Sequence, residues 1–481
     1  MKKILVISIA LAVVSVWAVP AMAVDWSADG WIGIGFLYYK NIPSGVGSPI
    51  WVGGIPFWGS PTIGGSMHAD WNKENAYVQM RGRLQLIARA SEDLYGVFYF
   101  EMDSTMWGER GAGQNTIGAW GADQVAVEVK NLYMDFRVPP QLPVWIRAGV
   151  QPYVIRPDFF LRVDGAGVSA RIMVDPINVS LNPFWAKETE GSDSRSDDMD
   201  IYGVDASIPI GPATVGGYFV YEVDREVTPN LSDECAVWWL GAYADATVGP
   251  VTVALDFAYD NGAWHDAGAG SDVNFQGWGF RGVASMDVNI FNVGIGGLYY
   301  SGGNTEDIGS DYGWFIRPRS SEYTGTLDDS VIFGGWGSWY GPGIGHASLP
   351  GWQSFWTTRL WYSPNLAYAP SMSGMWGVRA FGSVQPLDWL KVMVQVAYWG
   401  DTTENGDTYG SSRDPTGWDD NDEIGWEFDI SAQVQIYKNL ILKTAFGYLI
   451  AGSALDQWNP FVGNESPQDP WAWHTSLIYT F

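Results

Sequence analysis

Apolar and polar side chains alternate along many segments of this chain, and this period-two pattern restricts the fold more than any other feature. Residues 424–437 show it most clearly, with large apolar side chains at every second position and mostly polar ones between them. The same alternation runs through 77–89, 250–260 and 387–399. Because successive side chains of a β-strand point to opposite faces, each segment is predicted to be a strand with one apolar and one polar face.

The connections between these segments alternate between short and long. Tight turns are predicted at Ser91–Glu92, Pro139–Pro140, Asp175–Pro176, Pro209–Gly211, Gly249–Pro250, Asp287, Gln385–Pro386 and Lys438–Asn439. Long polar, glycine-rich connections are predicted at 40–73, 104–122, 152–165, 187–198, 225–236, 261–273, 302–372, 400–423 and 452–470. About eight short and about nine long connections would join about eighteen strands.

This sorting of the connections is typical of outer-membrane barrels, which have short periplasmic turns and long external loops. A soluble β-sandwich has no reason to sort its loops in this way. Lipid offers no hydrogen-bond partner to free backbone groups, so a membrane sheet must close on itself. We therefore predict an all-β fold: a transmembrane antiparallel up-and-down β-barrel of about eighteen strands, within about 16 to 20, whose first strand (28–39) pairs with its last (471–481).

Finer features of the barrel are also predicted. The parity of the apolar positions slips near Asn131, which indicates a β-bulge in the fourth strand. The segment 355–362 is either an extra strand or part of a folded loop. Aromatic residues near strand ends suggest two girdles at the membrane interfaces. The candidates are Trp26, Trp31, Tyr38, Tyr39, Trp399, Trp471 and Trp473.

The start of the chain has the pattern of an export signal. Lys2 and Lys3 precede a short apolar run, and a small-residue cleavage site ends at Ala23. We expect residues 1–23 to be a cleaved signal peptide and residues 24–481 to form one domain in the cell outer membrane. Polar residues and glycines interrupt every later apolar run, so no membrane-spanning helix is expected.

Composition and charge exclude several classes of function. The chain contains 59 Gly and 28 Trp but only 16% charged residues, and its net charge of −27 argues against a nucleic-acid partner. A single cysteine, Cys235, excludes an intramolecular disulfide. The four histidines lack metal-ligand spacing, and neither a metal nor a cofactor is expected. They are His68, His265, His346 and His474.

The last strand resembles the terminal signature of outer-membrane barrels. Leu477, Tyr479 and Phe481 alternate, and Phe481 is the last residue. This signature is the one that such barrels offer to their assembly machinery. Together with the signal-peptide pattern, it implies a Gram-negative outer-membrane protein.

Two sets of segments resemble particular barrel families. The run 131–136, followed by 145–149 and 164–170, is similar to bacterial porins, and the closing hairpin around 427–449 is similar to alginate-export-like eighteen-stranded barrels. The porin resemblance implies a homotrimer as one assembly. An alginate exporter would line its pore with basic residues, whereas this chain is acidic overall, so the resemblance carries over the fold rather than the substrate.

A barrel of this size has an interior too wide for side chains to fill, and an aqueous channel follows. The parity of the strands places charged residues on its lining, where rings of charge select ions and orient polar solutes. The predicted pore-lining residues are Arg81, Arg83, Arg89, Glu101, Asp103, Arg147, Arg171, Arg281, Arg379 and Lys391. Arg81, Arg83 and Arg89 share one strand face and suggest local contacts with anions or sugars. For each residue alone, solvation of a wet lumen is the simpler interpretation.

A constriction usually requires a loop that folds inward. By analogy with porins, the candidate is the third long loop, 152–165, with Arg156, Asp158, Arg162 and Asp164 as its charged residues. The much longer loop 302–372 could plug the pore, stack sugars or contact a partner.

One short motif offers an enzymatic alternative. His474 and Ser476 have the spacing used by outer-membrane phospholipases, but their parity points both side chains into the lumen, away from lipid. Acidic runs in the external loops favour solvated surface, with divalent-cation bridging to lipopolysaccharide as the alternative.

The sequence therefore predicts a porin, not an enzyme, that lets small hydrophilic solutes or ions diffuse through a water-filled channel. The alternatives are a substrate-selective or polysaccharide-export pore, and a blocked structural or adhesive surface barrel. The expected surroundings are outer-membrane lipid and lipopolysaccharide.

Overall fold

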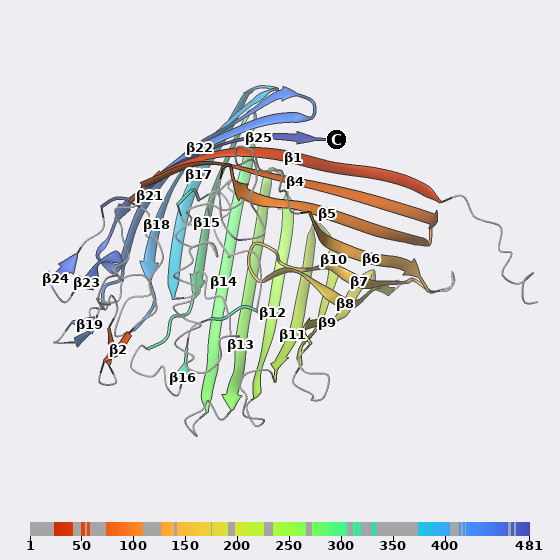
Figure 1. The fold of residues 1–481 in the computed structure, drawn as a ribbon, viewed down its shortest axis with the longest axis horizontal. Helices are drawn as coiled ribbons and strands as arrows, with labels where there is room; N and C mark the ends of the chain where they lie inside the picture. Colours follow the sequence, from red (N-terminus) through yellow and green to blue (C-terminus); the bar gives the residue numbers. More distant parts are fainter. Residues whose placement is uncertain are drawn as a thin grey trace, which may run out of the picture.

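The computed structural model consists almost entirely of long antiparallel strands (Figure 1). It describes residues 24–41, 50–52, 55–57, 74–108, 127–138, 142–174, 176–190, 198–225, 234–265, 272–304, 311–313, 315–318, 330–332, 374–404, 413–414, 417–418, 420–459, 463–465 and 468–481. The wall strands are β1 (Asp25–Lys40), β4 (Glu74–Ser91), β5 (Leu94–Met106), β6 (Glu128–Arg137), β7 (Val144–Ile155), β8 (Leu161–Val174), β9 (Val179–Thr189), β10 (Met199–Ile210), β11 (Ala213–Asp224), β12 (Glu234–Val248), β13 (Val251–His265), β14 (Val273–Val288), β15 (Phe291–Tyr300), β17 (Met375–Leu387), β18 (Leu390–Asp401), β21 (Glu423–Tyr437), β22 (Leu440–Ala451) and β25 (Trp471–Thr480).

These eighteen strands form a closed ring, as the sequence predicts. Each pairs with its neighbours in chain order, and β1 also pairs with β25 over ten positions, from Trp31–Thr480 to Lys40–Trp471. Figure 1 shows these first and last strands side by side. A further strand, β16 (Asp311–Tyr312), joins the sheet through a short parallel pairing with β14 and is not part of the ring.

Short elements lie in the connections. They are β2 (Ile50–Val52), β3 (Ile55–Phe57), β19 (Arg413–Asp414), β20 (Gly417–Trp418), β23 (Gln457–Asn459), β24 (Gly463–Glu465) and the 3₁₀ turn η1 (Ser453–Leu455). No helix among the described residues has the length and hydropathy needed to cross a membrane. The predicted signal peptide and the segment 355–362 lie outside the described residues.

Tight turns join β4 to β5, β10 to β11, β12 to β13, β14 to β15, β17 to β18 and β21 to β22, each at a predicted turn or within three residues of it. The predicted turn residues Pro139, Pro140 and Asp175 lie outside the described residues. The predicted boundaries of one long connection are wrong. Residues 152–165 do not form a long loop, because β7 continues to Ile155, β8 begins at Leu161, and the two strands pair up to that point. Pro152 and the charged residues around it resemble loop sequence, although their backbone is extended and paired.

The two faces of the wall differ as the alternation predicts. Along β21, Trp426, Phe428 and Ile430 expose 45–50% of their surface on the outside, whereas Glu427 and Asp429 between them are buried on the inside. Exposure of so many large apolar side chains to water would be unfavourable, so the outer face is suited to lipid.

Aromatic pairs mark the loop end of this outer face. Trp376, Tyr398 and Trp426 contact one another in a row across β17, β18 and β21. Tyr38 packs edge-on against Trp471 across the β1–β25 seam, with ring centroids 4.9 Å apart. These residues form part of a girdle at the membrane interface.

Trp399 was expected in this girdle, and the prediction is wrong. Its side chain is fully buried inside the barrel and donates a hydrogen bond to Glu427 over 2.9 Å. Trp399 has the opposite parity from its outward neighbour Tyr398, so the strand directs it inward.

The bulge predicted in the fourth wall strand is present in β6. Tyr99 pairs with Asn131 and Phe100 pairs with Val129, so Lys130 is the extra residue. A bulge of this kind shifts the side-chain parity along the strand. The shift brings Lys130 to the charged cluster described below.

Candidate functional site

The β7–β8 hairpin leaves the barrel wall and enters the lumen. The ladder between β6 and β7 ends at Leu132–Val150, and the ladder between β8 and β9 begins only at Ala166–Lys187. Beyond these pairs, β7 and β8 stay paired with each other as a two-stranded ribbon. We call this ribbon, residues 151–165, the inner hairpin.

Two glycines permit the bend at the base of the inner hairpin. Gly149 has a φ of +129°, and a Cβ there would lie 2.2 Å from the carbonyl oxygen of Leu132. Its partner across the ribbon is Gly167, where a Cβ would lie 2.1 Å from the carbonyl oxygen of Trp185. Only glycine allows this backbone conformation and this close approach between strands.

Aromatic residues at the tip fasten the inner hairpin to the lumen side of the wall. Phe160 stacks on Tyr218 of β11, with ring centroids 4.5 Å apart, and meets Trp239 of β12 edge-on. Phe159 stacks on Tyr300 of β15 at 5.7 Å. Both phenylalanines are fully buried, and such burial contributes about 1.5–3 kcal/mol per side chain.

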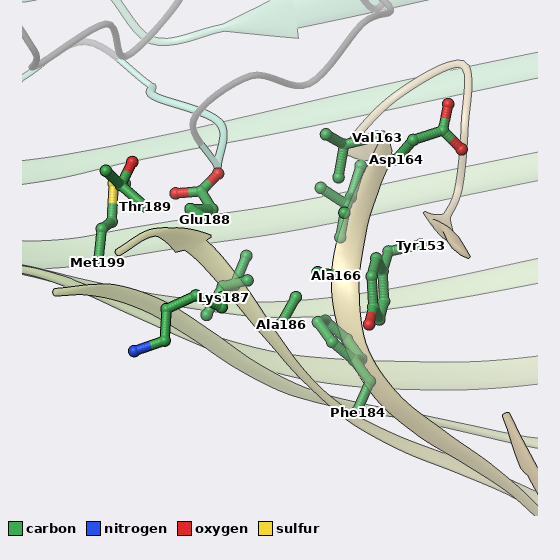
Figure 2. Close-up of a pocket in the computed structure, with 13 residues that line it drawn as sticks. Tyr153, Val163, Asp164, Ala166, Phe184, Ala186, Lys187, Glu188, Thr189 and Met199 are labelled. Atoms are coloured by element: carbon green, nitrogen blue, oxygen red, sulfur yellow. The ribbon is translucent and has the colours of Figure 1, made fainter. Parts of the chain in front are cut away.

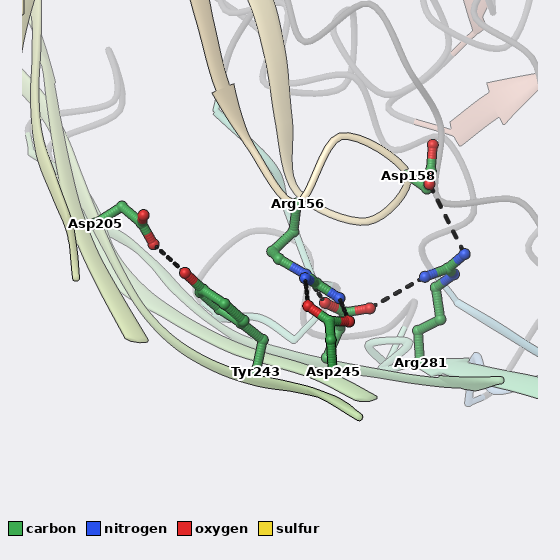
Figure 3. Close-up of polar contacts among 7 residues, drawn as sticks. Arg156, Asp158, Asp205, Tyr243, Asp245 and Arg281 are labelled. Carbon is green, nitrogen blue, oxygen red and sulfur yellow. Dashed lines mark hydrogen bonds and ion pairs between the residues drawn. The ribbon is translucent and has the colours of Figure 1, made fainter. Parts of the chain in front are cut away.

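Arg156 adds a polar attachment beside these rings (Figure 3). Its two terminal nitrogens donate to both carboxylate oxygens of Asp245 on β12, over 2.6 and 2.9 Å, and its Nε donates to Asp256 on β13. The guanidinium also lies over the ring of Tyr243, 4.6 Å from the centroid. Figure 3 shows Tyr243 donating in turn to Asp205.

This arrangement keeps Arg156 charged. Burial alone would lower its pKa, but hydrogen bonds to Asp245 and Asp256 outweigh it and raise the pKa above its usual value. Asp256 also accepts from Arg281 of β14 over 3.1 Å, and Arg281 lies 3.9 Å from Asp158 in the hairpin turn. Alternating acidic and basic side chains therefore join the tip of the inner hairpin to the wall.

The opposite face of the inner hairpin points away from this wall. Tyr153 and Ile155 are buried against it, whereas Val154 between them is 51% exposed. Arg162 pairs across the ribbon with Val154 and shares its face. Asp164, two residues on, reaches β6: it accepts from Lys130 over 2.6 Å and from Asn131 over 2.7 Å.

The arginines of β4 lie around the same carboxylate cluster. Arg83 pairs with Glu101 of β5 through its Nε, Arg81 lies 3.5 Å from Glu101, and Lys130 lies 3.9 Å from it. Arg81 and Arg83 therefore belong to a network of both signs rather than to an isolated basic row. Arg89 is set apart near the turn, exposed and stacked over Tyr95.

The remaining predicted pore-lining residues fall into separate places. Arg147 donates to Asp135 over 2.7 and 2.9 Å, and Arg171 lies 3.6 Å from the same carboxylate. Arg379 is buried and donates to Gln395 over 3.1 Å. Lys391 is exposed near the turn end of β18. The side chain of Asp103 lies outside the described residues.

A second segment packs inside the barrel, from the connection between β15 and β17. Ser330 donates to both oxygens of Glu427, over 2.8 and 2.9 Å, and the backbone N–H of Ile332 donates to Glu427 over 2.7 Å. The backbone N–H of Ile316 donates to Asp260 of β13 over 3.1 Å, and its carbonyl accepts from Trp239. Parts of the predicted loop 302–372 therefore occupy the lumen, and the rest lies outside the described residues.

Sequence reasoning missed several residues of this site. Asp245 and Tyr243 lie near the turn end of β12, where polar and charged residues are common. Nothing in the sequence therefore marked them as parts of this site. Lys130 was missed because the bulge in β6 shifts the parity of the side chains there. Phe159 and Phe160 were a usable signal, because two adjacent aromatic residues inside a supposedly polar loop require burial.

His474 and Ser476 face the lumen, as their parity predicts, and each is 1% exposed. No hydrogen bond joins the two side chains in the described part of the chain. No group of three or more acidic, histidine or cysteine side chains among the described residues could hold a metal ion.

Comparisons with known proteins give structural matches only. No family model matches the sequence, and no curated protein matches it. Three solved structures from Pseudomonas aeruginosa each have a TM-score of 0.51: OccK8 (OprE) at 11% identity, OccK2 (OpdF) at 10% and the outer membrane protein OpdK at 9%. Each match covers 95% of this chain and 98% of the other.

The chain has the fold of an eighteen-stranded outer-membrane barrel. At such low identity the matches establish the fold and not the solute. The functional features of this outer-membrane barrel lie in its own lumen. They are the inner hairpin, the charged clusters on either side of it and the packed segment around Glu427.

Proposed function

We propose that this barrel is a porin: a constricted, water-filled channel in the outer membrane through which small hydrophilic solutes or ions diffuse. The inner hairpin carries this proposal, because a ribbon fixed across a polar lumen narrows a channel without removing its charged lining. The predicted constriction residues Arg162 and Asp164 lie on the face of the hairpin that points away from the wall.

The charge pattern supports passage of polar rather than apolar solutes. On one side of the inner hairpin lie Arg81, Arg83 and Glu101. On its other side, Asp245 and Asp256 hold Arg156. Rings of mixed charge around a narrow passage orient polar solutes and discriminate among ions.

A wide export pore for polysaccharide is less compatible with this lumen, since the inner hairpin and the segments at 315–318 and 330–332 pack inside it. The alternative of a substrate-selective pore keeps the same geometry and differs only in how strongly the lining holds one solute. A blocked surface barrel would require that no continuous aqueous path remains.

Swelling of liposomes containing the folded protein tests the proposal. We expect rapid swelling in a monosaccharide, slower swelling in a disaccharide and little in larger oligosaccharides, because the inner hairpin sets a size limit. Protein-free liposomes and liposomes with heat-unfolded protein are the controls. Equal swelling with all sugars would contradict the constriction, and no swelling with any small solute would favour the blocked barrel.

A further inference from the structure

A cavity lies behind the inner hairpin, where β8 separates from β9 (Figure 2). Its volume is about 320 Å³, and it is bounded by the hairpin on one side and by β9 and β10 on the other. An apolar cavity of about 150 Å³ takes a benzene molecule, so this one has room for an aromatic ring with a short substituent.

The base of the cavity is apolar. Leu161, Ala186 and Ile201 are each at most 3% exposed, and they line it together with Phe184 and Val163. Tyr153 closes one side and packs against Phe184 in a tilted arrangement, with ring centroids 5.2 Å apart. An apolar group would gain free energy on entering, because these side chains exclude water.

The rim of the cavity is acidic. Glu188 and Asp164 both line it, but the Asp164 carboxylate is held on the other face of the hairpin by Lys130 and Asn131. Figure 2 shows Lys187 running away from the other side chains. The Lys187 ammonium is held by Asp198 at 2.8 Å, with Asp200 and Glu190 at 3.5 and 3.4 Å. The positive charge of Lys187 is therefore directed away from the cavity. The rim therefore offers the Glu188 carboxylate to a cationic group, and the same charge would repel an anionic group.

We propose that this cavity binds a small amphiphilic amine, with its apolar part against Phe184 and Val163 and its ammonium at Glu188. The site does not depend on channel activity, because it is formed by the back of the inner hairpin and the wall.

Calorimetric titration of the folded protein in detergent with 2-phenylethylamine tests this proposal, with phenylacetate as a probe of similar size and opposite charge. We expect saturable binding of the amine and at least tenfold weaker binding of the acid. A detergent blank corrects for partition into micelles. The absence of saturable binding of the amine, or equal binding of the two probes, would overturn the proposal.

Three variants locate the site. Val163→Phe fills the cavity and should weaken binding at least tenfold, whereas Val168→Phe places the same ring on the lipid face of β8 and should change nothing. Glu188→Gln keeps the shape of the rim and should weaken the amine several-fold without affecting phenylacetate. Unchanged amine binding in Val163→Phe, or unchanged binding in Glu188→Gln, would contradict the assignment.

Discussion

Arg156 is the residue on which the position of the inner hairpin depends most. Its side chain donates hydrogen bonds to two wall strands at once, to Asp245 on β12 and to Asp256 on β13. Asp256 is 2% exposed, so removal of Arg156 would leave this buried carboxylate with Arg281 as its remaining cationic partner.

We predict that Arg156→Ala lowers the free energy of unfolding by about 2 kcal/mol, less than the full cost of a broken buried pair because Asp245 is partly exposed. Urea unfolding measured by tryptophan fluorescence would show it. Arg171→Ala is the matched control, since this arginine is 57% exposed and should cost less than about 0.5 kcal/mol. Equal effects of the two substitutions would show that Arg156 does not anchor the hairpin.

At the scale of single strands, lipid-facing and lumen-facing positions of β21 should respond differently to the same charge. We predict that Ile430→Arg destabilises the barrel by about 2–4 kcal/mol, because Ile430 is 50% exposed on the outer apolar face. Gln433→Arg on the lumen face should leave stability nearly unchanged. Refolding equilibria into lipid vesicles would give the free energy of folding of each variant. A similar loss of folding free energy at both sites would contradict the assigned orientation of β21.

The bend of the inner hairpin makes a second prediction at this scale. Gly149→Ala should cost about 1–3 kcal/mol, because the backbone there has a positive φ and leaves no room for a Cβ. Gly382→Ala on β17 is the control, since its Cβ would meet nothing nearer than 3.9 Å. Urea unfolding would compare the two. A tolerated Gly149→Ala would mean that the ribbon bends without help from this glycine.

The elements also show what the sequence could predict. Period-two alternation gave the eighteen strands, the turns and the bulge near Asn131, because lipid outside and water inside impose opposite polarity on the two faces of each strand. The same logic failed at 152–165. One face of that ribbon packs on the inner wall and the other meets the lumen. Neither face contacts lipid, so the apolar pattern that lipid imposes on a strand is missing there.

The candidate site was predicted only in part for a related reason. The strand parity predicts that Arg83, Glu101 and Arg281 point inward, because orientation follows from position along a strand. Their partners depend on pairs formed across the lumen between distant segments, such as Arg156 with Asp245. A single sequence gives no signal for those pairs.

At the scale of the whole molecule, the balance of charge inside the lumen should govern ion selectivity. Glu101 is the carboxylate among three cations, Arg81, Arg83 and Lys130. We predict that Glu101→Gln shifts the cation-to-anion permeability ratio toward anions by about two- to fivefold, as removal of one charge near a narrow path would do. Reversal potentials under a salt gradient would measure it.

Glu92→Gln is the control for that shift, because Glu92 is exposed in the turn between β4 and β5 and should leave the ratio unchanged. If Glu101→Gln and wild type gave the same reversal potential, the cluster on β4–β6 would lie away from the ion path.

The most direct test of the whole account is the single-channel conductance of the purified, folded protein in a planar lipid bilayer. We predict discrete conducting steps, and larger or noisier steps for Arg156→Ala, whose inner hairpin has lost its attachment to Asp245 and Asp256. A folded barrel that never conducts would contradict the porin assignment, and steps unchanged by Arg156→Ala would contradict the role of the inner hairpin as the constriction.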